Sequence, residues 1–128
     1  MTTVEVTLNA QLASVLERMR RSVEGISAVG LADANGLPIA FLGPSAEKGA
    51  ATAMAALLVS AGHRAAEALG LPSVREVHVY VDGPVFLVCP IEDRFTLVVI
   101  LSEETNIGLV RLEMEKAAAE IHAIVASR

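Results

Sequence analysis

The chain has 128 residues and a formal net charge of −5 at pH 7, with 53% hydrophobic and 3% aromatic residues. This length predicts one domain, residues 1–128, with a single sizeable core. The acidic charge and the scarcity of aromatic residues argue against nucleic-acid binding, which needs basic patches or stacking platforms. The mean hydropathy of +0.54 is high for a soluble protein of this size, so we expect some apolar surface to be buried against another chain.

The sequence predicts neither a targeting segment nor a transmembrane segment. The opening residues, MTTVEVTLNAQ, lack the basic start and the long apolar core of a signal peptide. The longest uncharged helical stretch, residues 49–62, falls short of the roughly 20 residues that a membrane span needs. A single cysteine cannot form an intramolecular disulfide and is compatible with a reducing, cytoplasmic location.

The chain begins with a predicted amphipathic helix. Apolar residues recur at helical spacing from Leu8 to Val23, and charged residues lie between them. Thr7 or Asn9 is a candidate cap for the start of this helix, and Gly25 is expected to end it.

The apolar period then changes to two, which predicts a hairpin of two strands over residues 28–32 and 37–42. Asn35 and Gly36 are expected to supply the positive φ angles of the tight turn between them. Pro38 lacks an N–H group, so its strand should lie at an edge of the sheet or leave that position unbonded.

Two ligand sites that this region could suggest are excluded by their residue requirements. A calcium loop starting at Asp33 would need an oxygen donor, a glycine and a glutamate where Leu37, Pro38 and Pro44 stand. A phosphate-binding P-loop needs glycine directly before lysine and a hydroxyl after it, whereas Lys48 precedes Gly49. The chain therefore lacks the nucleotide-binding motif of that class of GTPase or ATPase.

A second helix is predicted from about residue 45 to residue 69, with Ser45 as its N-cap and Gly70 at its C-terminal end. Glu47 suits the positive end of the helix dipole. Residues 49–62 carry no charge, and a helix that is apolar nearly all round must be buried on more than one side. One side can pack on the chain's own sheet, and the other needs a further partner.

Three strands and a last helix complete the predicted order α-β-β-α-β-β-β-α. The strands are expected at residues 74–81, 85–91 and 95–102, and the last of them is the most continuously apolar, as a central strand would be. The final helix is expected at residues 107–126. Its predicted buried side comprises Leu109, Leu112, Ala117, Ile121 and Ile124.

The sequence carries no pattern of catalytic or metal-binding residues. His63, His78 and His122 are scattered over different elements, and Cys89 lies inside an apolar strand, where an inert buried thiol is usual. We therefore expect no enzyme activity, no cofactor and no metal. The arginines at positions 18, 20 and 21, with Lys48, are the only mild basic cluster; a solvated face is the default interpretation, and contact with an acidic partner is the alternative.

Three segments, taken together, resemble the roadblock / dynein light chain (roadblock/LC7) family. They are the hairpin LADANGLPIA, the strand pair VFLVCPIEDRFTLVVIL with its short acidic turn, and the last-helix segment NIGLVRLEMEKAAAEI. Each is weak alone, but they occur in the family's order and spacing over nearly the whole chain. The resemblance implies an α+β sandwich of the roadblock/profilin-like type, with a five-stranded antiparallel sheet, one helix on one face and two on the other.

The resemblance also implies a homodimer, formed by pairing the edges of the third strands and packing the second helices together. This arrangement would cover the over-apolar helix and the exposed strand edge. The expected dimer interface comprises Met54, Leu57, Leu58, Ala61, Val77 and Val79.

Family members regulate or scaffold small Ras-like GTPases, or act as adaptors, and are not enzymes in their own right. The resemblance thus implies a homodimeric module that binds a small Ras-like GTPase, at a surface that the sequence leaves undetermined. A small-ligand sensor and a purely structural adaptor are the alternatives. The sensor would need an apolar pocket with a few convergent polar groups.

Overall fold

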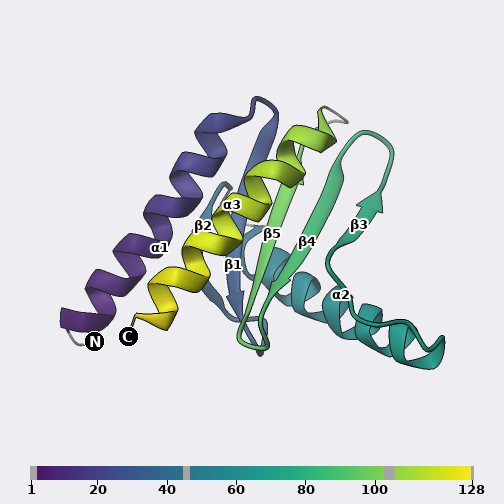
Figure 1. The fold of residues 1–128 in the computed structure, drawn as a ribbon. Helices are drawn as coiled ribbons and strands as arrows, with labels where there is room; N and C mark the ends of the chain where they lie inside the picture. Colours follow the sequence, from purple (N-terminus) through teal and green to yellow (C-terminus); the bar gives the residue numbers. More distant parts are fainter. Residues whose placement is uncertain (1–2, 45–46, 103–105, 128) are drawn as a thin grey trace.

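The computed structural model describes residues 3–44, 47–102 and 106–127, which form a sheet between two helical layers. The elements in chain order are α1 (Thr3–Ser22), β1 (Ile26–Asp33), β2 (Pro38–Leu42), α2 (Lys48–Ala68), β3 (Val77–Tyr80), β4 (Val85–Ile91), β5 (Phe95–Leu101) and α3 (Ile107–Ala126). The antiparallel sheet has the order β2-β1-β5-β4-β3. Figure 1 shows α1 and α3 side by side on one face and α2 on the other. The predicted fold class, the order of elements and the central place of β5 are confirmed.

The main core lies between the sheet and the α1–α3 layer. Alternate residues of the central strands, such as Val29, Leu87 and Leu97, point into it, and Leu16 and Ile121 meet them from the two helices. All five are fully shielded from solvent. Because both helices present an apolar side to one sheet face, this face is completed within the chain.

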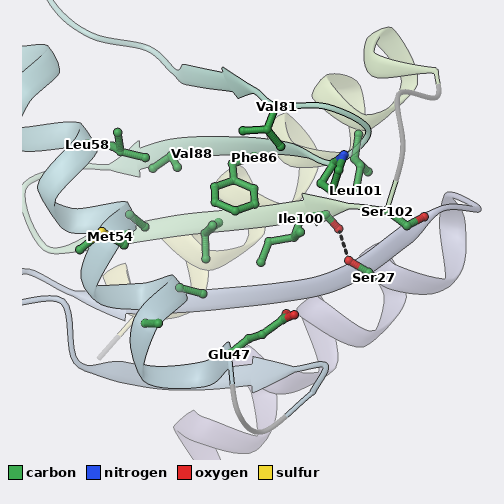
Figure 2. A pocket seen from close by; sticks show the side chains of 15 residues that line it. Ser27, Glu47, Met54, Leu58, Val81, Phe86, Val88, Ile100, Leu101 and Ser102 are labelled. Atoms are coloured by element: carbon green, nitrogen blue, oxygen red, sulfur yellow. Dashed lines mark hydrogen bonds between the residues drawn. The ribbon is translucent and has the colours of Figure 1, made fainter.

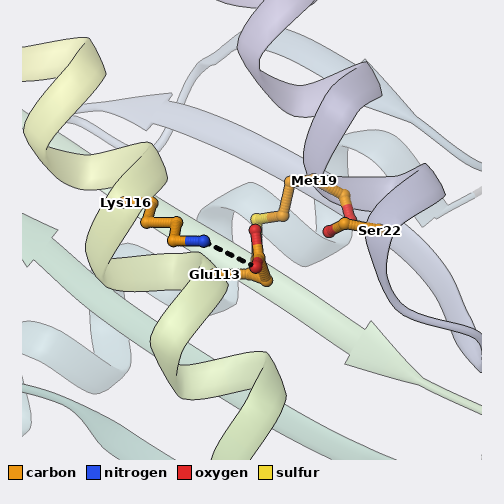
Figure 3. A network of polar contacts seen from close by, with 4 residues as sticks. All are labelled: Met19, Ser22, Glu113 and Lys116. Atoms are coloured by element: carbon orange, nitrogen blue, oxygen red, sulfur yellow. Dashed lines mark hydrogen bonds and ion pairs between the residues drawn. The ribbon is translucent and has the colours of Figure 1, made fainter.

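Polar contacts at the outer surface of this layer tie α1 to α3. Arg18 Nη2 on α1 lies 2.6 Å from Glu120 Oε2 on α3. Figure 3 shows a second place where the two helices approach, with Met19 of α1 beside Glu113 and Lys116 of α3. Lys116 Nζ lies 3.3 Å from Glu113 Oε1 within α3. The exposed Arg18–Glu120 pair adds little stability compared with the apolar core beneath it.

The starts of the first two helices differ from expectation. The first helix begins at Thr3, so neither Thr7 nor Asn9 caps it, and Thr7 Oγ1 instead donates to the Thr3 carbonyl at 3.0 Å within the helix. The predicted cap Ser45 lies outside the described residues. Glu47 precedes the second helix, and its side chain makes no capping hydrogen bond.

The turn between β1 and β2 is a hairpin turn, but Asn35 does not have the positive φ expected of it. Gly36 alone supplies the left-handed residue, with φ +85°. Asp33 holds the turn, because its Oδ1 accepts from the N–H groups of Asn35 at 2.8 Å and Leu37 at 3.0 Å. Pro38 begins β2, an edge strand, as expected.

Two other expectations need correction. β3 covers only residues 77–80 instead of the predicted 74–81. The last helix has the predicted bounds and is capped by Asn106 Oδ1, which accepts from the Leu109 N–H at 3.1 Å. Leu109 and Leu112 are nevertheless exposed, because Val110 and Met114, each one or two positions further on, occupy the row that faces the sheet.

Candidate interaction face

The side of α2 that faces the sheet is narrow. Its buried residues are Thr52, Ala55, Val59 and Ala66. Ala55 and Val59 form a small second core with Val88 of β4 and Val98 of β5. The side chains are short, so this helix buries far less apolar surface than the α1–α3 layer does.

The opposite side of α2 is an exposed row of apolar residues, here called the α2 stripe. Met54 is 48% exposed and Leu57 is 59% exposed. Ala50, Ala53 and Ala61 are also exposed, and their spacing of three and four residues places all five on one side of the helix. Large exposed side chains between small ones form a surface that another helix can approach closely.

Beside the stripe, α2 leaves part of the sheet uncovered, and this opening is an apolar groove of about 440 Å³. Met54 and Leu58 line it from the helix, Phe86 and Ile100 form part of its floor, and Val81 lies at its end (Figure 2). The hydroxyls of Ser27 and Ser102 lie at its rim and donate to the carbonyls of Ile100 at 3.0 Å and Gly25 at 3.2 Å. Apart from Glu47, the groove therefore offers little polar chemistry.

The third part of this face is the free edge of β3, here called the β3 edge. In the described residues β3 pairs with β4 alone, so one side of its backbone has no strand beside it. Val77 packs against the small core under α2, and Val79, two residues on, lies on the same face of the sheet opposite Phe86 of β4. The edge is short but apolar, which is a template for pairing with another strand.

The six residues expected at a dimer interface thus share one face of the molecule. Leu57 and Ala61 lie on the α2 stripe, and Val77 and Val79 lie on the β3 edge. Met54 lies on the stripe and, with Leu58, also lines the groove.

Sequence reasoning missed the floor of the groove. Phe86 and Ile100 lie in continuously apolar strands, where both alternating sets of residues are hydrophobic and periodicity cannot assign a face. Leu69 and Leu71, at the end of α2, were also missed. The signal available for them was two large apolar residues on either side of Gly70, at the predicted end of the helix.

The other face of β3 carries a small polar cluster beside α3. Glu76 Oε1 lies 2.5 Å from Arg111 Nε of α3 and 3.2 Å from His78 Nε2. The rings of His78 and Tyr80 meet edge to face, 6.2 Å between centroids. Within the described part of the chain, the buried His78 Nε2 lacks a well-oriented hydrogen bond. The cluster ties the edge strand to α3 and brings no nucleophile together with a base.

The remaining cysteine and histidine side chains lie on separate parts of the fold and do not form a common site. Burial raises the pKa of the Cys89 thiol, the carboxylates of Glu76 and Glu115 raise it further, and Arg75 opposes them. His63 is exposed on α2, and His122 pairs with Glu92 on the opposite side of the sheet. No group of three His, Cys, Asp or Glu residues that could hold a metal occurs in residues 3–44, 47–102 and 106–127.

Among the helices in the described ranges, none combines the length and the apolar character that crossing a membrane requires.

Comparison with known proteins identifies the family. The Roadblock/LC7 domain model matches residues 12–101. Among solved structures, Myxococcus xanthus MglB is 25% identical with a TM-score of 0.83, over 93% of this chain and 90% of that one. A Roadblock/LC7 domain from Streptomyces avermitilis is 20% identical with a TM-score of 0.84, over 89% of this chain and 97% of that one.

A more distant similarity extends to profilin II of Acanthamoeba castellanii, at 13% identity and a TM-score of 0.65, over 88% of this chain and 97% of that one. No curated protein sequence matches the chain at a significant level. The matched segment contains every strand of the described sheet and the whole of α2, which are the elements that build the candidate interaction face. The chain therefore belongs to the Roadblock/LC7 domain family.

Proposed function

We propose that the chain is a non-catalytic homodimer that regulates or scaffolds a small Ras-like GTPase in the cytoplasm. The observation that carries the dimer is the α2 stripe lying on the same face as the β3 edge and the groove. A two-fold dimer buries the same patch of both copies, so a patch must complement itself. Pairing one β3 with its copy would bring the two α2 helices together over a continuous sheet.

The physical chemistry favours covering this face. Met54 and Leu57 are large apolar side chains about half in contact with water, and the groove exposes part of Phe86 and Ile100 beside them. Burying apolar surface contributes roughly 25 cal/mol per Å². A stable interface buries about 1,600 Å² in total, so the proposed dimer would need to use the helix, the groove and the edge together.

The chain belongs to the Roadblock/LC7 domain family. The GTPase partner is proposed because resemblance to this family implies regulation or scaffolding of small Ras-like GTPases. A binding protein that contributes no catalytic group can still change a GTPase by binding one of its switch states more tightly.

The dimer is tested by light scattering at several concentrations, with the variant Leu58→Asp. A charge in the groove wall beside the stripe should convert a dimer to monomers, because a buried carboxylate without a partner is costly. Leu37→Asp is the matched control, since Leu37 is 62% exposed in the β1–β2 turn at the other edge of the sheet. A native protein that remains monomeric at all concentrations would remove the dimer from the proposal.

The GTPase is tested by calorimetric titration with small GTPases of the source organism, each loaded with GDP or with a non-hydrolysable GTP analogue. We expect binding with a preference for one nucleotide state. A dimer that binds neither state of any of them would leave the structural adaptor as the better description.

The groove keeps a small-ligand sensor as the second candidate. Its volume of about 440 Å³ is within the range of ligand sites. It is open along one side, however, and among the described residues that line it Glu47 is the sole charged one. A stable monomer that binds small apolar molecules would favour the sensor over the GTPase platform.

A further inference from the structure

We propose that Leu69 and Leu71, at the C-terminal end of α2, insert into the groove of a second copy of the chain, and that each copy does so reciprocally. This inference rests on the proposed homodimer and names contacts beyond the six expected interface residues.

The exposure of these two leucines is not explained by the single chain. Leu69 is 72% exposed and Leu71 is 56% exposed, and they follow one another on either side of Gly70. An apolar residue directly after the glycine of such a helix end commonly contacts the last helical turn, but Leu71 remains more than half exposed. Apolar residues that are exposed, large and close together indicate a contact with another molecule.

The backbone holds both leucines in fixed positions. The N–H of Gly70 donates to the Glu67 carbonyl at 3.2 Å, and the N–H of Leu71 donates to the Ala66 carbonyl at 2.8 Å. Gly70 has φ +67°, which completes a Schellman-type helix end. Because the backbone is already ordered, insertion of the leucines would cost little conformational entropy.

The path of α2 carries them past the edge of the sheet. A Cβ built on Gly62 would lie 3.4 Å from the side chains of Val74 and Val77, so the helix crosses the β3 edge at Gly62. Leu69 is seven residues further on, about 10 Å along a helix that rises 1.5 Å per residue. Figure 1 shows the C-terminal end of α2 projecting beyond β3.

A two-fold axis at the β3 edge places these residues over the partner's groove. Such an axis makes the paired strands antiparallel, so the Val77 end of one β3 lies beside the far end of the other. The projecting end of α2 leaves its own sheet at the Val77 end. The groove opens at the far end of β3, where Val81 lines it with Phe86. The projecting leucines of one copy therefore arrive at the open groove of the other.

The chemistry of the groove matches this occupant. Met54, Leu58, Phe86 and Ile100 present apolar walls, and the hydroxyls at the rim already donate to backbone carbonyls. An aliphatic side chain needs no polar partner, which this groove scarcely offers. The groove is thus an incomplete core that a second copy completes.

The first test is the double variant Leu69→Gln/Leu71→Gln, measured by analytical ultracentrifugation. Each leucine is buried twice in a symmetric dimer, so we expect the dissociation constant to rise by about 100-fold or more. The urea midpoint of the isolated monomer should not fall, because both side chains are exposed there. Leu37→Gln, at an exposed leucine of the opposite edge, should leave the dissociation constant unchanged.

The second test is a disulfide trap with Leu69→Cys and Val81→Cys in a Cys89→Ser background, under a mild oxidant. The proposed insertion brings Leu69 of one copy close to Val81 of the other. We therefore expect covalent dimers, because a disulfide forms only where the two Cα atoms lie within about 7 Å of each other. Leu37→Cys combined with Val81→Cys, and Leu69→Cys alone, are the controls and should give far less cross-linking.

The outcomes separate this inference from the proposed function. A native dimer that is unaffected by the double glutamine variant and forms no disulfide would overturn the leucine insertion and leave the homodimer intact. A native protein that is monomeric at every concentration would overturn both.

Discussion

The two faces of the sheet are covered very differently. On one face, α1 and α3 together bury residues such as Leu16, Leu97 and Ile121 completely. On the other face, a single helix with alanine-rich contacts leaves a groove open over β4 and β5. One face is therefore a finished core, and the other is a half-built one whose remaining apolar surface is available for association. Most of the buried apolar surface thus lies on one side of the sheet, and the proposed interaction surface lies on the other.

The largest expected difference between the faces is in the stability of the monomer. Leu97→Ala removes a fully buried side chain from the finished core and should lower the free energy of unfolding by about 2–5 kcal/mol. Leu57→Ala, on the α2 stripe, should change it by less than about 0.5 kcal/mol. Urea unfolding at a dilution where the chain is monomeric measures both. Equal losses in the two variants would mean that the stripe is part of the monomer's core.

A smaller effect is expected where α2 meets the β1–β2 turn. Gly36 has φ +85°, and a Cβ there would lie 3.1 Å from the Ala53 Cα of α2. Gly36→Ala should cost about 1–2 kcal/mol, because alanine disfavours that conformation and the helix must shift. Thermal unfolding measures the loss, and Gly49→Ala is the control, since nothing lies within 4 Å of a Cβ there. If the two variants have the same unfolding temperature, the close approach of α2 does not restrict the residue at position 36.

The smallest effect concerns Cys89, at the edge of the finished core. Burial, reinforced by Glu76 and Glu115, raises the pKa of its thiol. Because folding raises the pKa of this thiol, the neutral thiol stabilises the folded state. This contribution is fully present below the pKa of the unfolded chain, about 8.5, and is lost as the pH rises through the pKa of the folded protein. Alkylation by iodoacetamide at pH 8 should therefore be slower in the native protein than in urea. Equal rates would show that β4 is open at this edge.

The order of the elements could be read from the sequence because each depends on local periodicity. The bounds of α3 were predicted correctly and the end of α2 to within one residue, since Asn106 and Gly70 form their own local hydrogen bonds with the helices. The hairpin was also correct, although Asp33 and not Asn35 holds its turn. A side-chain hydrogen bond across four residues is a weaker signal in a sequence than an Asn-Gly pair.

Which side of a helix or strand is buried was harder to predict than whether a segment forms a helix or a strand. Leu109 and Leu112 were assigned to the buried side of the last helix, but the row that faces the sheet begins at Val110. In β4 and β5 nearly every residue is apolar, so the sequence did not indicate that Phe86 and Ile100 would lie under an opening. Which side of an apolar element is covered depends on where distant elements pack.

The sequence by itself determined the types and order of the elements and the excess of apolar residues in α2, because hydrophobic periodicity and helix-end signals act over a few residues. The tertiary structure decided which of those apolar residues remain exposed. The groove exists because α2 crosses the sheet at an angle and covers only part of it. Leu69 and Leu71 project because that crossing carries the end of α2 past β3. Both features depend on how a helix is placed on a sheet, which is set by packing between residues far apart in the chain.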